Sequence, residues 1–158
     1  MNAEEISQAL THPFNGAFPY QKNIVVPNVR HGFLDYEADL LVVTGSNYLK
    51  EIEIKTSLAD LRADNKKTKH ANWERPTNFV CELYYAMPSE IFEKVKNKPP
   101  VPDHAGILVI YKFPHRTMIK FERQAKRRQN VKPLTTEQVL QIARLGTMRY
   151  WSRSKNIC

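Results

Sequence analysis

The stretch from Asp35 to Lys55, DYEADLLVVTGSNYLKEIEIK, predicts two β-strands joined by a short turn. Leu40–Val43 is a compact apolar run, and Glu51–Lys55 alternates strictly between charged and apolar side chains. Between them, Thr44–Asn47 supplies residues that are typical of turns. The sequence therefore predicts an antiparallel hairpin, and the remaining elements are interpreted around it.

The charged side chains of both strands fall on one face of this hairpin. Alternate residues of a strand point to opposite sides, so Glu37 and Asp39 share a face, as do Glu51, Glu53 and Lys55. Pairing around the turn sets Asp39 near Glu53 and Glu37 near Lys55, with Cβ atoms about 4.5–5.5 Å apart in directly opposed pairs. Opposed like charges are destabilising. A divalent cation offsets them, because Mg²⁺ takes hard oxygen ligands from one or two carboxylates.

Asp39, thirteen further residues, and then Glu53-Ile54-Lys55 resemble the active-site signature of the PD-(D/E)XK, or restriction-endonuclease-like, nuclease superfamily. The resemblance implies an α/β fold with a mixed central sheet flanked by helices. It also implies that Asp39 and Glu53 bind Mg²⁺ (Mn²⁺ being an alternative ion), that Lys55 assists the attacking water, and that Glu37 is a further acid. Ala38 stands where the superfamily's name-giving proline would be.

The superfamily often adds a glutamate from a helix that precedes these strands. Ala3–Thr11 predicts such a helix, with Asn2 as its N-cap and two acids in its first turn. By resemblance, either Glu4 or Glu5 takes this role, and Glu5 lies nearer the edge of the apolar helix face. Ordinary charges at a helix start are the alternative for both. The wording EAD…EIEIKTSLADLRAD is similar to small phage-borne or prophage-borne members of the superfamily.

Positive charge is concentrated in the last third of the chain. The 24 Lys and Arg exceed the 16 Asp and Glu by eight, which gives a net charge of +8. From Lys112 onward there are twelve basic residues and two Glu, whereas the rest of the chain has twelve basic and fourteen acidic residues. A basic end joined to an acidic patch suits a protein that grips phosphates while its carboxylates hold a metal. The charge distribution therefore indicates a polyanionic partner, and the resemblance implies that this partner is DNA.

Two basic segments are candidates for contact with the DNA backbone. The helix predicted after Ser57 carries Arg62, Lys66 and Lys69 in one stripe, although a solvated face is the simpler interpretation of that stripe alone. The segment 122–133 is expected to be an exposed arm or loop. Such a cluster neutralises phosphates without reading bases. The cations singled out in this segment are Arg123, Lys126, Arg127 and Arg128.

Composition limits the class of protein. A length of 158 residues with 42% hydrophobic content fits one globular domain. No apolar run approaches the ~20 residues of a membrane span, and the first fifteen residues lack the features of a signal peptide. Two cysteines agree with a reducing compartment. We therefore expect no membrane partner and a cytoplasmic location, and the resemblance implies a bacterial or phage-infected host cell.

The expected order of helices and strands indicates an α/β layered domain with a mixed central sheet and a basic C-terminal third, 112–158. We predict a Mg²⁺-dependent deoxyribonuclease that hydrolyses phosphodiester bonds by water attack. Cutting both strands of a duplex would favour a two-fold homodimer. The alternatives are a non-catalytic nucleic-acid-binding protein that retains the fold and a nuclease directed at RNA.

Overall fold

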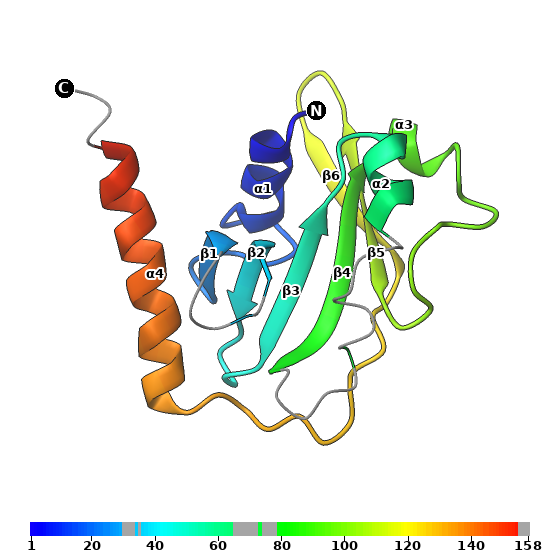
Figure 1. The fold of residues 1–158 in the computed structure, drawn as a ribbon. Helices are drawn as coiled ribbons and strands as arrows, with labels where there is room; N and C mark the ends of the chain where they lie inside the picture. Colours follow the sequence, from blue (N-terminus) through cyan, green and yellow to red (C-terminus); the bar gives the residue numbers. More distant parts are fainter. Residues whose placement is uncertain (30–33, 35, 65–72, 74–78, 155–158) are drawn as a thin grey trace.

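The computed structural model describes residues 1–29, 34, 36–64, 73 and 79–154, and its centre is a six-stranded mixed sheet flanked by helices (Figure 1). The strands are β1 (Ile24–Val29), β2 (Ala38–Val43), β3 (Leu49–Ile54), β4 (Val80–Pro88), β5 (Gly106–Lys112) and β6 (Thr117–Arg123). They lie side by side in sequence order. The pairs β3–β4 and β4–β5 are parallel, and the others are antiparallel. The expected α/β class with a mixed sheet is confirmed.

Helices cover both faces of the sheet. They are α1 (Ala3–Thr11), α2 (Leu58–Asp64), α3 (Ser89–Phe92) and α4 (Thr136–Ser154). On one face, Ile6 and Leu10 of α1 are fully buried against the strands. The other face packs against α2, α3 and α4 through Leu61, Phe92 and Ile142. Two covered faces explain why β4 and β5 are continuous apolar runs rather than alternating ones.

The hairpin has the register that the sequence predicts. Leu40 pairs with Ile52, and continuing this register by one pair sets Asp39 opposite Glu53. In the turn, the Asn47 N–H donates to the Thr44 carbonyl over 2.8 Å. Asn47 has φ 60°, a left-handed conformation that Asn adopts more readily than most residues. On the charged face of the hairpin, Glu51 and Glu53 are buried, whereas Asp39 is only partly buried.

The start of α1 also follows its prediction. Asn2 Oδ1 accepts the Glu5 N–H over 2.8 Å, and Glu5 Oε2 accepts the Asn2 N–H over 2.9 Å. This reciprocal pair satisfies two N–H groups that the helix itself leaves open. Because one Glu5 oxygen is committed to the cap, the cap also fixes the direction of the Glu5 side chain.

Glycine has a low helix propensity and often follows the end of a helix, so the sequence alone predicts that the final helix weakens or ends at Gly146. Instead, α4 continues through Gly146 to Ser154 and lies along the edge strand β1 (Figure 1). A Cβ atom at Gly146 would lie 3.2 Å from a Val26 methyl group, closer than most such contacts. The missing side chain therefore allows close approach of helix and strand, and packing outweighs the low helix propensity of glycine.

Gly106, the first residue of β5, gives a stability prediction. A Cβ atom there would lie 2.4 Å from the Tyr84 ring and 2.7 Å from the Ala125 nitrogen. The Tyr84 ring is held edge-on by Phe18 and Phe121, so it has little room to move. We expect Gly106→Ala to lower the free energy of unfolding in urea by about 1–3 kcal/mol.

The matched control is Gly45→Ala in the β2–β3 turn. No atom lies within 4 Å of a Cβ built at Gly45. The free energy of unfolding should therefore stay within about 0.5 kcal/mol of the original protein. Equal losses at Gly106 and Gly45 would contradict the steric argument.

Candidate active site

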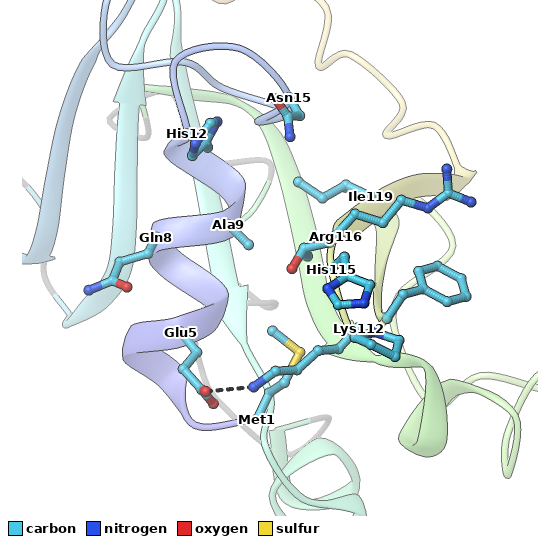
Figure 2. A pocket seen from close by; sticks show the side chains of 13 residues that line it. Met1, Glu5, Gln8, Ala9, His12, Asn15, Lys112, His115, Arg116 and Ile119 are labelled. Carbon is cyan, nitrogen blue, oxygen red and sulfur yellow. Dashed lines mark hydrogen bonds and ion pairs between the residues drawn. The ribbon is translucent and has the colours of Figure 1, made fainter.

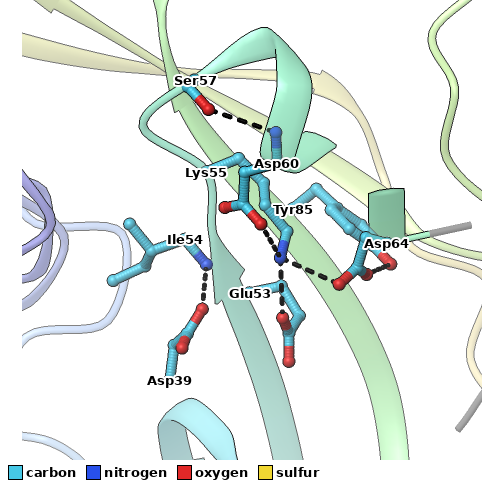
Figure 3. A network of polar contacts seen from close by, with 8 residues as sticks. All are labelled: Asp39, Glu53, Ile54, Lys55, Ser57, Asp60, Asp64 and Tyr85. Carbon is cyan, nitrogen blue, oxygen red and sulfur yellow. Dashed lines mark hydrogen bonds and ion pairs between the residues drawn. The ribbon is translucent and has the colours of Figure 1, made fainter. Parts of the chain in front are cut away.

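Lys55 follows β3 directly, and its ammonium group lies inside the protein between two carboxylates (Figure 3). The Nζ atom is 3.1 Å from Glu53 Oε2 and 2.9 Å from Asp64 Oδ1. All three side chains are at most 3% exposed. The Ser57 hydroxyl accepts the Asp60 N–H over 3.1 Å and caps the start of the next helix. This cap starts α2 directly after Lys55, and one further helical turn brings Asp64 back to the ammonium group.

Two tyrosines complete this buried polar group. The Tyr85 hydroxyl donates to Asp64 Oδ2 over 2.5 Å, and the parallel register of β3 and β4 sets Tyr85 beside Glu53. The Tyr36 hydroxyl donates to Glu51 Oε2, and Glu51 is the next residue on the same face of β3. Sequence reasoning missed both tyrosines. The alternation of side chains along β4 assigns Tyr85 to one face of the sheet. Only the pairing of β4 with β3 shows that the same face carries Glu53.

The surroundings of Lys55 fix its charge. Burial alone would lower the pKa of the ammonium group, but Glu53 and Asp64 outweigh burial and hold this pKa above its usual range. Burial and the hydrogen bond to Asp64 raise the pKa of the Tyr85 hydroxyl. Lys55 is therefore a fixed cation at neutral pH, and Tyr85 remains a neutral hydrogen-bond donor.

Asp39 lies at the same end of the hairpin (Figure 3). Its Oδ2 atom accepts the Ile54 N–H over 2.8 Å, so the backbone of β3 orients the carboxylate. Asp39 also lines a pocket of ≈ 380 Å³ together with residues of α1 and β1. Unlike Glu53, it is only partly buried. The hairpin thus combines one carboxylate beside a pocket with one that is inside the core.

Of the two helix glutamates, the structure brings Glu4 and not Glu5 to the Asp39 pocket. Glu5 Oε1 instead pairs with Lys112 Nζ over 2.9 Å (Figure 2). Lys112 and the Asn2 N–H together lower the pKa of the Glu5 carboxyl group. The cap described above explains this direction, because it ties the other Glu5 oxygen to the start of α1.

Glu37 precedes β2 and is exposed. The expected neighbour of Lys55 in this register was Glu37. Among the described residues, the carboxylates within 4 Å of the ammonium group are instead those of Glu53, Asp60 and Asp64, two of which come from α2. The helix that follows β3 therefore supplies two of the acids beside Lys55.

The segment 122–133 is not a free arm, because β6 extends to Arg123 and two of the four predicted phosphate contacts bind backbone carbonyl groups. Arg123 donates to the Ala105 and Pro102 carbonyls over 2.8 and 2.7 Å. Arg128 donates to the Trp73 carbonyl over 2.5 Å. Both side chains are half-buried. The expectation of an exposed arm is wrong for these two residues, whose guanidinium groups join distant segments.

The other predicted phosphate contacts are more accessible. Lys126 is exposed, and Arg127 is exposed with its guanidinium 4.1 Å from the centre of the Tyr48 ring. Arg62 is exposed on α2. Lys66 and Lys69 lie outside the described residues. Of the three residues of the predicted helix stripe, the structure therefore describes Arg62.

Comparison with known proteins adds information on the fold. No protein-family model matches the chain, and no curated protein matches it. Among solved structures, the chain is similar to a protein of unknown function from Silicibacter pomeroyi, with a TM-score of 0.62 and 13% sequence identity. The match covers 99% of this chain and 92% of that one. At this identity the similarity shows an α/β fold shared over the whole length.

Two further findings concern the described residues alone. Among them, no group of three or more His, Cys, Asp or Glu side chains is arranged to hold a metal ion. Of the helices in the described part of the chain, none is both long and apolar enough to cross a membrane.

The raised pKa of Tyr85 predicts how stability changes at alkaline pH. The unfolded chain releases the tyrosine proton near pH 10, whereas the folded chain keeps it, so stability falls as the pH rises above that value. Tyr85→Phe removes this proton. Above pH 10, we expect the free energy of unfolding of this variant to fall less steeply with pH than that of the original protein. The two slopes should differ by about 1.4 kcal/mol per pH unit.

The same variant should be less stable at pH 7, by about 1–3 kcal/mol, because Asp64 loses a buried hydrogen-bond donor. Urea unfolding at several pH values between 7 and 11 measures both effects. Parallel pH profiles of the variant and the original protein would contradict the assignment.

Proposed function

We propose that this protein is a metal-dependent nuclease that hydrolyses phosphodiester bonds in DNA. The observation that carries the proposal is the position of Asp39, Glu53 and Lys55 at one end of two neighbouring antiparallel strands. This arrangement supports the resemblance to PD-(D/E)XK nucleases, in which the Asp lies on one strand and the Glu-x-Lys on the next. A chance match of the short sequence pattern would not require this register.

The donor chemistry of the hairpin fits Mg²⁺, with Mn²⁺ as an alternative. Asp39 and Glu53 offer carboxylate oxygens, and Mg²⁺ commonly uses only one or two protein carboxylates together with waters and substrate phosphates. A cage of three or more protein ligands is therefore not needed. A bound Mg²⁺ would polarise the scissile phosphate and lower the pKa of its water ligand. The Ile54 N–H holds Asp39 in one orientation, which suits a metal ligand.

For Lys55 we propose electrostatic stabilisation rather than proton abstraction. Its raised pKa keeps the ammonium group charged at neutral pH, so it is a poor base. The Nζ atom lies 3.9 Å from a carboxylate oxygen of Asp60, whose side chain is 47% exposed. The buried ammonium group is thus within ion-pair distance of a partly exposed carboxylate, and in this proposal its charge stabilises negative charge that develops on the phosphate. In this proposal, Asp64 and Tyr85 position Lys55.

DNA is the proposed partner, and the cytoplasm of a bacterial or phage-infected cell is the proposed location. A homodimer would suit cleavage of both strands of a duplex.

The second candidate function is that of a nucleic-acid-binding protein without catalysis. The burial of Glu53 and Lys55 favours it, because ion pairs with 2–3% exposure are also found as purely structural elements.

Asp39→Asn is the sharpest test of the catalytic proposal. An amide oxygen can still accept the Ile54 N–H, so the fold should persist while a charged metal ligand is lost. We expect the rate of Mg²⁺-dependent nicking of supercoiled plasmid to fall at least about 100-fold. Mutation of even the outer-shell partners of metal ligands typically lowers metal affinity or activity by about 10–100-fold. EDTA should abolish the activity of the original protein.

The matched control is Asp103→Asn, the same chemical change at an exposed position before β5. It should keep full activity, and circular dichroism should show both variants to be folded. Full activity of Asp39→Asn would remove Asp39 from the mechanism. Binding of DNA without any cleavage by the original protein would favour the non-catalytic candidate.

A further inference from the structure

A second pocket lies on the other side of α1, between this helix and the turn that joins β5 to β6 (Figure 2). Its volume is ≈ 500 Å³. Among the described residues that line it, the charged or imidazole-bearing side chains are Glu5, His12, Lys112, His115 and Arg116. One acid thus faces two permanent cations and two imidazoles. None of the predicted DNA-contacting residues lines this pocket.

The pocket is at the same edge of the sheet as the candidate active site. Strands β3, β4 and β5 are parallel, so their carboxyl ends meet at one edge. Lys55 follows the end of β3, and Lys112 ends β5. In open α/β sheets, ligands bind at this edge. Gln8 of α1 lines both this pocket and the Asp39 pocket, so the two pockets adjoin across one helix.

The cations of this pocket are accessible to a ligand. The Lys112–Glu5 pair has side chains that are 56% and 40% exposed, and exposed ion pairs of this kind are weak. Lys112 can therefore exchange Glu5 for a stronger anion. Arg116 is exposed, and its guanidinium lies 5.2 Å from the centre of the Phe113 ring. This contact holds a planar donor, suited to bidentate phosphate binding, beside the pocket.

We propose that this pocket binds the phosphate backbone of the nucleic acid beside the candidate active site. Arg116 makes the main phosphate contact, and Lys112 makes a second one after leaving Glu5. The half-exposed Phe113 ring supports the guanidinium from one side. The proposal rests on the proposed function for its substrate. It adds that the strand passes from the Asp39 pocket across α1 to the β5–β6 turn.

Binding without catalysis tests the pocket separately from the reaction. Fluorescence anisotropy of a labelled DNA duplex is measured in EDTA between 50 and 200 mM salt, for the original protein and Arg116→Ala. For Arg116→Ala we expect a Kd at 100 mM salt that is about tenfold higher than that of the original protein. The slope of log K against log salt should fall by about 0.9 for one lost phosphate contact.

The matched control is Lys22→Ala, which removes the same charge at an exposed position outside all predicted DNA contacts. Lys22 lies near the opposite edge, because it precedes β1, whose first residue Ile24 pairs with Val43 beside the β2–β3 turn. The control should keep the original Kd and salt slope. Equal losses in the two variants would mean that only the total charge matters, and this would overturn the pocket.

Cleavage assays with Mg²⁺ separate failure of the pocket from failure of the proposed function. If the original protein cleaves DNA and Arg116→Ala raises KM more than it lowers kcat, both proposals are supported. If the original protein cleaves while Arg116→Ala keeps the original Kd and salt slope, the pocket is wrong and the nuclease stands. If only binding is seen, and Arg116→Ala weakens it, the pocket stands without the nuclease. If the original protein shows neither binding nor cleavage, both proposals are overturned.

Discussion

The structure depends on neutralising the charge of Lys55 inside the core. An ammonium group removed from water is costly unless it is paired and hydrogen-bonded. Glu53 and Asp64 provide that pairing at 3.1 and 2.9 Å, and Tyr85 in turn satisfies Asp64. These partners come from β3, α2 and β4. The ion group therefore requires α2 to start directly after β3 and β4 to lie beside β3 in one register.

The hairpin and the start of α1 could be predicted because their signals are local. The turn residues fix the pairing of β2 with β3, and alternation then assigns each side chain to a face. The cap formed by Asn2 and Glu5 depends on residues three positions apart. For the candidate site, this local information is sufficient to bring Asp39, Glu53 and Lys55 to one end of the hairpin.

The remainder of the site depends on contacts between distant segments, which a single sequence does not fix. Tyr85 reaches Asp64 only through the parallel pairing of β3 with β4, which lie on either side of α2 in the chain. Arg123 belongs to a basic run that is typical of an exposed arm. Its partners are carbonyl groups of residues 102 and 105, and no side-chain pattern marks these acceptors. Gly146 likewise is explained only by the strand packed against it.

The buried ion group also bears on the choice between the two candidate functions. Apolar side chains of similar volume often stabilise a core at least as well as a buried ion pair does, so stability alone is a weak reason for these charges. A purely structural role would be satisfied by Lys55, Glu53 and Asp64 without Asp39. Asp39 nevertheless lies opposite Glu53, beside a pocket, and is oriented by the Ile54 N–H. Asp39 thus combines a fixed orientation with partial exposure beside a pocket, and this combination is compatible with the metal-ligand role proposed above.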